Sequence, residues 1–531
     1  MCVCVFSHYC WELLGVVWCG VVVALWSLCV LCVSAHEGTQ PAAVRLALGD
    51  TRDAVTVTWA TAEPTRESVV RWGPFGTGAA RGGGPLPDVA RGAQRNFTDG
   101  GAEKRSHMIH TVRLARLVAG RRYSYVAGDP SGGWSDVFSF VAPRSDAQIS
   151  KDALRIIAYC DMGDTNSLTL ADVQEEVRQK KYDMLIHCGD FAYDLDTDNG
   201  RVGDAWMRSI EPVSAYLPYM VSPGNHEESY NFSHFKARFD MPGEQARATD
   251  NHYYSFDMGP AHIVAYNTEA FFWPQHFDVE YMRRMYKWLE EDLARANANR
   301  QAVPWIIVHG HRPMYCVVSD HVTGHCDGEQ EASRRGIPSE CDVDDAHLCS
   351  AVASGANSAT FPVEDLFFKY GVDLAFYGHV HDYERYWPVY NETVMNGTHT
   401  ELGLYYEPKA TVHVTTGSGG NPEMIYGPKF WKPPPRGLCT RDSPWCAFQS
   451  GYFPRDGQMA DFTYSRLTVH NATHLDWEQW SSIDEGVIDR FTVVQPRHGP
   501  FPGAGDVAKE RLRLRLRRLG PSDVSNLKTD V

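Results

Sequence analysis

The stretch Ile186-His187-Cys188-Gly189-Asp190-Phe191-Ala192-Tyr193 decides how the rest of the chain is interpreted. Together with Met184-Leu185 before it, it is an apolar run that ends in a glycine, followed by a carboxylate and, three residues later, a phenol. This pattern is typical of a buried strand that leaves an open α/β sheet at its carboxyl edge, where such sheets bind their ligands. Asp190 is suited to bridge two metal ions there, and Tyr193 to bind one of them. For this segment alone, an ordinary strand followed by a turn is the alternative.

Length and composition indicate a globular protein with more than one domain. The chain has 531 residues, of which 43% are hydrophobic and 12% aromatic, and this length exceeds that of one ordinary core. The formal net charge of −16 argues against a broad surface for nucleic acid, so we expect no nucleic-acid partner. The 22 histidines would make the charge more positive in an acidic compartment.

The first 35 residues predict export. Residues 13–33 are almost entirely apolar, and Val33-Ser34-Ala35 offers small residues to a signal peptidase. Because the apolar run is also long enough to span a bilayer, residues 1–35 are expected to be a cleaved signal peptide or a retained signal anchor that attaches the protein to a membrane. The predicted location is the secretory pathway: secreted, in a lysosome-like compartment, or membrane-anchored with a lumenal or extracellular catalytic domain.

Cysteines and glycosylation sequons agree with export. In an oxidising compartment, cysteines crowded within one stretch are expected to form disulfides that hold long loops. One such group is Cys316, Cys326, Cys341 and Cys349, and the other is Cys439 and Cys446. Asn-x-Ser/Thr sequons, which predict a glycoprotein, begin at Asn96, Asn231, Asn391, Asn396 and Asn471.

The body of the chain divides into two parts with different patterns. From about residue 40 to 142, short alternating segments separated by Gly- and Pro-rich turns predict an antiparallel β-sandwich that supports the second domain or walls its cleft. Residues 143–152 are polar and predict a linker. From about 150 to 495, strands alternate with helices, which predicts a mostly parallel sheet. Residues 496–531 contain no pattern that would pack, and their arginines predict a solvated basic tail, with a weak membrane or polyanion contact as the alternative.

Four more apolar runs end on side chains that bind metals. Each segment alone is weak evidence, because turns and His-x-His pairs are common, but five in this order point strongly to one site. The further candidates are Asp161 after the strand 154–160, Asn225 and His226 in a tight turn, His311 after the strand 304–308, and His379 and His381 after the strand 372–377.

These residue types fit a two-metal site that acts on phosphate esters. Carboxylates and imidazoles suit zinc, iron and manganese, and a bridging carboxylate can hold two ions about 3.5–4 Å apart. Such ions polarise a phosphate oxygen and lower the pKa of a bound water, which is most of what phosphoryl transfer requires. No Gly-x-Ser-x-Gly elbow or Walker loop competes for this role.

The five blocks, taken together, resemble those of the purple acid phosphatases in their large, animal-like form, and the resemblance runs from about residue 40 to 495. It implies an α+β protein in which an N-terminal, fibronectin III-like β-sandwich precedes a four-layer α/β/β/α metallophosphoesterase domain. It also implies an acid phosphatase, a phosphoric monoester hydrolase, that acts on small phosphorylated substrates through a metal-bound hydroxide at a dinuclear Fe(III)–M(II) centre. A nucleotide phosphodiesterase or pyrophosphatase on the same scaffold, or a non-catalytic secreted binding protein, is the alternative.

Residue by residue, the resemblance implies the following site. Asp161, Tyr193 and His381 would bind one Fe(III), and Asn225, His311 and His379 one divalent ion (zinc, iron or manganese), with Asp190 bridging. His226 would orient the substrate phosphate or protonate the leaving group. Tyr193 distinguishes the purple acid phosphatases from generic metallophosphoesterases, which lack the ligating tyrosine. The generic enzymes also have Asp-x-His in the first block, whereas this chain has Gly163 in place of that histidine.

Two positions depart from the family pattern. Cys160 stands where the first block usually has glycine, so Cys160 and Cys188 would lie near the metals and their oxidation would perturb the site. Plant members carry two histidines where this chain has Asp320 and His321, so His321 is a second catalytic candidate, with an ordinary loop residue as the alternative. We expect His309 and His187 to pack in the core, and Glu227 to orient His226.

Overall fold

The computed structural model describes residues 37–76, 86–317, 329–336, 361–395, 398–399, 403–424, 439, 443–450 and 461–505. The expectations for the leader, for His321, for Asn396 and for Cys326, Cys341 and Cys349 lie outside these ranges. Within the described residues, no helix has both the length and the apolar character needed to cross a membrane.

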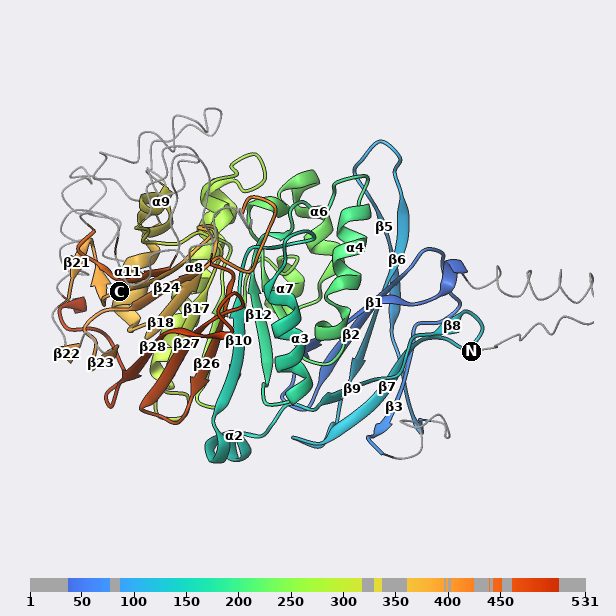
Figure 1. Ribbon diagram of the computed structural model, residues 1–531, viewed down its shortest axis with the longest axis horizontal. Coiled ribbons are helices and arrows are strands. Elements are labelled where there is room, and N and C mark those ends of the chain that lie inside the picture. The colour runs from blue at the N-terminus through green and yellow to red at the C-terminus, as the bar shows by residue number, and fades with distance from the viewer. Residues whose placement is uncertain are drawn as a thin grey trace, which may run out of the picture.

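The N-terminal part is an antiparallel β-sandwich at one end of the molecule (Figure 1). One sheet has the order β1-β2-β6-β5 and the other β4-β3-β7-β8, with β9 paired to β7. The strands are β1 (Ala42–Leu48), β2 (Val55–Thr61), β3 (Val69–Pro74), β4 (Asp88–Arg91), β5 (Ala93–Thr98), β6 (Ser106–Leu114), β7 (Arg122–Asp129), β8 (Gly133–Trp134) and β9 (Phe138–Val141). Trp59 and Tyr125 are fully buried between the sheets. The mostly exposed edge strands β4 and β5 carry little hydrophobic alternation, which explains why the sequence pattern did not reveal them.

A short helix interrupts the predicted linker. It is α2 (Asp146–Asp152), and it begins at a capping box in which Ser145 and Gln148 satisfy each other's backbone N–H groups. The sandwich packs against the second domain through β1, which contacts β14 and the helices α4 (Arg201–Ser209) and α5 (Glu211–Ser214).

The second domain contains two mixed sheets, as the four-layer architecture implied by the resemblance requires. The first has the order β14-β12-β10-β26-β27-β28-β23-β22, and the second β15-β16-β17-β18-β24-β19-β25. The parallel strands β14, β12 and β10 form one end of the first sheet, and β16, β17, β18 and β24 form the middle of the second. A C-terminal meander returns along the first sheet antiparallel to β10, so this sheet is less parallel than the pattern predicted. The first sheet comprises β10 (Leu154–Tyr159), β12 (Met184–Cys188), β14 (Tyr219–Ser222), β22 (Thr398–His399), β23 (Leu404–Tyr406), β26 (Thr463–Val469), β27 (His474–Ser481) and β28 (Gly486–Val494). The second comprises β15 (Tyr254–Met258), β16 (Ala261–Ala265), β17 (Trp305–His309), β18 (Leu374–Tyr377), β19 (Tyr383–Tyr386), β24 (Val412–Thr416) and β25 (Cys446–Ser450).

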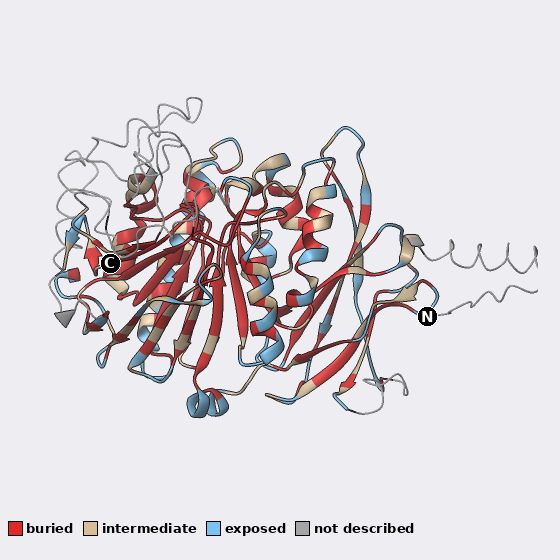
Figure 2. Ribbon diagram, in the orientation of Figure 1, coloured by how far each residue is buried: buried red, intermediate tan, exposed pale blue. Residues whose placement is uncertain are grey.

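Helices cover the outer faces of the two sheets, which gives the four layers that the resemblance implied. Helix α3 (Thr169–Gln179) packs against β26, and α8 (Val279–Ala298) packs against β17 and α11 (Val363–Tyr370). The amphipathic pattern of 279–296 predicts Trp288, Leu289 and Leu293 on the inner side of α8. Leu289 and Leu293 are fully buried there, and Trp288 is half-buried. Figure 2 shows the central strands as buried and the outer sides of the helices as more exposed. Smaller helices are α6 (Ser229–Arg238), α7 (Gly243–Ala248) and α9 (Glu329–Arg335).

The packed chain extends beyond the predicted start of the tail at residue 496. Phe501 and Ala504 are buried against Phe368 and Ala410. His498 lies with Nδ1 2.9 Å from Oδ1 of Asp373. The prediction of an unpacked tail is therefore wrong for residues 498–504, whose two apolar side chains are too few to produce a periodic signal.

Candidate metal centre

All five blocks follow strands that end at one edge of the paired sheets. Asp161, Asp190 and Asn225 follow β10, β12 and β14 of the first sheet, while His311 and His379 follow β17 and β18 of the second. Two groups of buried side chains offer ligand atoms within 4.8 Å of one another. One group is Asp190, His311 and His379, the other is Asp161, Asp190 and His381. Asp190 belongs to both, which is the position that a bridging carboxylate needs.

The phenol of Tyr193 lies beside the group of Asp161, Asp190 and His381. The Oη atom of Tyr193 lies 2.7 Å from Nε2 of His381 and donates a hydrogen bond to Oδ1 of Asp161 at 3.3 Å. Nδ2 of Asn421 donates to the same Oη atom at 2.7 Å. Tyr193, His381 and Asp161 therefore offer an oxygen-rich set with one imidazole, a donor set that suits iron.

The amide of Asn225 lies beside the group of Asp190, His311 and His379. Nε2 of His311 lies 3.1 Å from Oδ2 of Asp190 and 3.1 Å from Oδ1 of Asn225. Nδ1 of His311 lies 2.9 Å from the carbonyl oxygen of Cys188, which orients the ring. The rings of His311 and His379 are 5.2 Å apart. Imidazole nitrogens with amide and carboxylate oxygens suit a divalent zinc, iron or manganese ion.

Charge in the site fits a cation. Burial opposes protonation of His311, but the carboxylates of Asp190 and Asp161 outweigh it and raise its pKa to about 10. Burial also opposes ionisation of Asp190, yet His311 and His226 hold its pKa well below the usual range. The cluster is thus balanced by protons on imidazoles, and metal ions replace such protons when they bind.

Three of the candidate ligands have an unfavourable backbone conformation. Asp161, Asp190 and His379 have φ values of 62°, 59° and 69°, in the left-handed region that non-glycine residues seldom adopt. Such strain gathers at functional sites, where the surrounding structure holds it. At Gly189, φ is 94° and a Cβ atom would lie 2.6 Å from Nδ1 of His311, so only glycine fits between β12 and Asp190.

His226 lies beside both groups and has its own carboxylate partner. Nδ1 lies 2.5 Å from Oδ1 of Asp194, Nε2 lies 3.9 Å from Oδ2 of Asp190, and the ring lies 4.2 Å from that of Tyr193. Burial lowers its pKa, but Asp190 and Asp194 together raise it to about 10. The imidazole is therefore a proton donor that faces the metal centre.

Three residues of the centre were missed or given another role. Glu227 was expected to orient His226, but its carboxylate instead accepts from the backbone N–H groups of Asp190, Phe191 and Gly224, at 2.9, 2.8 and 2.8 Å. Asp194 takes the orienting role, and its place directly after Tyr193 was the available signal. Asn421 follows the Thr416–Gly420 stretch that carries part of the resemblance.

The histidines predicted to be structural do lie in the core. His187 is fully buried with Nδ1 2.7 Å from the hydroxyl of Tyr219, and His309 stacks on Phe376. Within the described residues, the asparagines of the sequons are exposed, as glycosylation requires; they are Asn96, Asn231, Asn391 and Asn471. Cys439 and Cys446 form a disulfide, as predicted from their spacing.

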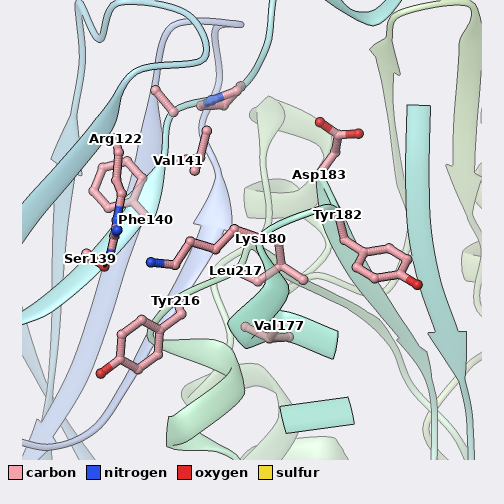
Figure 3. A pocket seen from close by; sticks show the side chains of 12 residues that line it. Arg122, Ser139, Phe140, Val141, Val177, Lys180, Tyr182, Asp183, Tyr216 and Leu217 are labelled. Atoms are coloured by element: carbon pink, nitrogen blue, oxygen red, sulfur yellow. Dashed lines mark hydrogen bonds between the residues drawn. The ribbon is translucent and has the colours of Figure 1, made fainter. Parts of the chain in front are cut away.

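A separate crevice between the sandwich and the second domain is shown in Figure 3. Its lining includes Arg122 from the sandwich, and Lys180, Tyr182 and Tyr216 from the second domain. Since Tyr182 precedes β12, this crevice lies at the amino end of that strand, opposite to the edge that carries Asp190. It is therefore not part of the metal centre.

Two ligand groups that share one aspartate, at the carboxyl edge of two packed sheets, define a metallophosphoesterase. A calcineurin-like phosphoesterase family model matches residues 154–383, a model for the N-terminal domain of purple acid phosphatases matches 41–142, and a model of an iron/zinc purple acid phosphatase-like protein C matches 410–490. Acid phosphatase type 7 of Homo sapiens is 39% identical over 91% of this chain and 97% of its own. The chain belongs to the purple acid phosphatase family.

More distant relatives agree. Purple acid phosphatase 22 of Arabidopsis thaliana is 29% identical over 71% of this chain and 72% of its own. The structure of purple acid phosphatase PPD1 from yellow lupin (Lupinus luteus) seeds has a TM-score of 0.63 and 24% identity, and covers 86% of this chain and 75% of that one. At this identity the match supports the fold. Family membership implies a dinuclear, iron-containing centre.

Proposed function

We propose that this chain is an acid phosphatase that hydrolyses phosphate monoesters of small molecules at acidic pH. The observation that carries the proposal is the place of Asp190 in both ligand groups, with His226 beside it. The alternative of a phosphodiesterase or pyrophosphatase is not favoured by the relatives, which are named acid phosphatases and purple acid phosphatases.

The chain's own residues divide the work. When bound, a dinuclear centre supplies a water of lowered pKa and positive charge for the phosphate oxygens. Asp190 sets the relation between the two halves of the site, and the remaining side chains of the two groups position each half. His226, with Nδ1 engaged by Asp194, has Nε2 available to bind the phosphate or to protonate the leaving oxygen.

For the metals, we propose one Fe(III) held by Asp161, Tyr193 and His381, and one zinc, iron or manganese ion held by Asn225, His311 and His379. The short contact between the Tyr193 hydroxyl and His381 supports the first assignment. The test is the visible spectrum with metal analysis. A phenolate–Fe(III) band and about one iron per chain are expected for the wild type, and Tyr193→Phe should abolish the band. A colourless wild type without iron would overturn the assignment.

For location, we propose the secretory pathway. The apolar leader, the Cys439–Cys446 disulfide and the exposed sequons support it. Expression in a eukaryotic host should give secreted or lumenal protein whose mass falls after treatment with an N-glycosidase. Cytosolic protein without glycans would contradict the proposal. We expect small phosphorylated substrates and no nucleic-acid partner.

The activity is tested with Asp190→Ala and His311→Ala. Both should reduce hydrolysis of p-nitrophenyl phosphate by at least about a thousand-fold, since each removes a ligand. His470→Ala is the matched control, because its side chain is 42% exposed and lies outside the metal centre. Unchanged hydrolysis in the ligand variants would overturn the proposal. Faster hydrolysis of bis-p-nitrophenyl phosphate than of the monoester by the wild type would instead indicate a phosphodiesterase.

A further inference from the structure

Two cysteines lie directly beneath the metal centre and face each other from neighbouring strands. Strands β10 and β12 are parallel neighbours whose last register pair is Tyr159 with His187. The next residue on each strand is a cysteine, and the Cα atoms of Cys160 and Cys188 lie 4.7 Å apart, a separation that a disulfide can span. Both residues are fully buried. We propose that Cys160 and Cys188 form a disulfide that is a covalent clamp on the metal centre and fixes the separation of the two strand ends that carry Asp161 and Asp190.

The two cysteines are connected to three of the proposed ligands. Asp161 directly follows Cys160, and its N–H donates to the carbonyl oxygen of Gly189 at 3.1 Å, across the two strand ends. Asp190 follows two residues after Cys188. The carbonyl oxygen of Cys188 is the atom that orients His311. A change in the distance between the two cysteines would therefore move ligands of both metal ions.

The clamp holds two strand ends whose ligand residues have an unfavourable backbone conformation. Asp161 and Asp190 both have left-handed φ values, which are unfavourable for residues with side chains. Their carboxylates lie in one group of ligand atoms. A covalent link between the strands holds the two carboxylates at that separation in the protein before it acquires metal.

The chemistry of the clamp balances as a thiol–disulfide exchange. The two thiols lose two protons and two electrons as the sulfur–sulfur bond forms, and a disulfide oxidant of the secretory compartment takes them up and becomes two thiols. Once the chain has folded, burial keeps reductants from both sulfur atoms, so the clamp is permanent in the native state. The effect of the clamp on metal retention rests on the proposed dinuclear centre. The existence of the bond, and its effect on the stability of the metal-free protein, do not depend on that proposal.

The bond itself is tested by peptide mapping. Denatured, unreduced protein is alkylated and digested with trypsin, which separates Cys160 in the peptide 156–178 from Cys188 in the peptide 182–201. A linked pair that disappears on reduction is expected. Alkylated, unlinked forms of both peptides would overturn the proposal.

The mechanical role is tested with metal-free Cys160→Ala, Cys188→Ala and the double variant. Because either substitution breaks the bond, each single variant and the double variant should melt at a temperature lower than that of the wild type by about the same amount, on the order of 5 °C. Losses that add in the double variant would show that the cysteines act only by packing and would overturn the clamp. The wild type and the double variant, both refolded with a dithiol reductant that removes every other disulfide from each, should have the same melting temperature.

Metal retention gives the final readout. After dialysis against a chelator, the clamp variants should lose iron several-fold faster than the wild type. Cys439→Ala with Cys446→Ala is the matched control, since it removes the other described disulfide from a segment that holds no proposed ligand. Equal iron loss in the clamp variants and the wild type, with the bond present on mapping, would overturn the role in the metal centre. A wild type that never binds metal would refute the proposed function, while mapping and melting would still test the clamp.

Discussion

The carboxylate of Asp194 lies 2.5 Å from Nδ1 of His226, which turns the other ring nitrogen toward the metal centre. Asp194 lies outside both ligand groups, with its side chain 45% exposed, and His226 is the residue it positions. A carboxylate in this place fixes the orientation of the ring and favours its protonated form. The pair therefore separates the handling of protons from the binding of metal.

The first prediction concerns this pair. Asp194→Asn should lower kcat for p-nitrophenyl phosphate by about 10- to 100-fold, because the ring loses its orientation and its charged partner. Iron content and the visible band should stay unchanged, since Asp194 belongs to neither ligand group. Asp198→Asn is a control in the same loop, where the carboxylate is 62% exposed and pairs with Arg201. Loss of metal in Asp194→Asn would show that the residue supports the centre itself.

The second prediction concerns the buried carboxylate that joins two ligand loops. Glu227→Gln should lower the free energy of unfolding by about 2–4 kcal/mol, because an amide presents one acceptor and an unwanted donor to three backbone N–H groups. Metal content should fall as well, since Asp190 and Asn225 lie on the loops that Glu227 connects. Denaturant unfolding and metal analysis measure the two effects.

The neighbouring glutamate provides the control for that experiment. Glu228 belongs to the same turn, but its carboxylate is 35% exposed and contacts His276 at 3.0 Å. Glu228→Gln should cost less than about 1 kcal/mol and leave the metals in place. If Glu227→Gln and Glu228→Gln lose the same unfolding free energy and metal content, the loss comes from disturbing the turn as a whole and not from the three backbone N–H groups.

The sequence predicted the ligand residues better than it predicted their surroundings. Asp161, Asp190 and His311 follow apolar runs, and the direction of parallel strands is enough to bring such residues to one edge. Glu227 and Asp194 could not be assigned in this way, because their partners depend on which loops face each other across the two sheets. Carboxylates near an imidazole look alike in sequence, and only the packed loops distinguish them.

The same reasoning explains the errors in the fold. The amphipathic pattern of 279–296 predicts a helix and the apolar run 154–160 predicts a strand, and α8 and β10 lie within a few residues of these bounds. The pattern of residues 462–470 and 473–480 predicts a hairpin, and β26 and β27 form it, but their place in the first sheet beside β10 is a long-range contact with no local signal. The proposed disulfide between Cys160 and Cys188 depends on that sheet order too, since it requires β10 and β12 to be neighbours.

The third prediction concerns the hydrogen bond from Asn421 to Tyr193. Nδ2 of Asn421 donates to the phenolic oxygen at 2.7 Å, and a donor stabilises charge on a phenolate. Asn421→Ala should therefore move the phenolate–Fe(III) band to longer wavelength while about one iron per chain remains. Activity should fall by less than about ten-fold, because no proposed ligand is removed. Optical spectra with metal analysis test this, and an unshifted band would show that Asn421 does not act on the phenolate.

The fourth prediction concerns stability at acidic pH. His252 is 3% exposed among Phe232, Phe235 and Phe277, and burial lowers its pKa to about 3. In the unfolded chain the pKa is about 6.5, so between these values the unfolded state binds the additional proton and stability falls as the pH falls. The loss is about 1.4 kcal/mol per pH unit, or about 2 kcal/mol at pH 5.

Replacing this histidine with an apolar ring should remove that loss. His252→Phe should narrow the difference in unfolding free energy between pH 7.5 and pH 5 by about 2 kcal/mol, measured by denaturant titration at both values. His470→Phe, on the surface with 42% of its side chain exposed, should leave the difference as it is in the wild type. Since both measurements compare one variant with itself, any change in packing cancels. If the unfolding free energies of the wild type and of His252→Phe fall equally between pH 7.5 and pH 5, the buried ring carries its proton in the folded protein. Stability in an acidic compartment must then be limited by other buried histidines. One is His413, whose pKa burial also lowers to about 3.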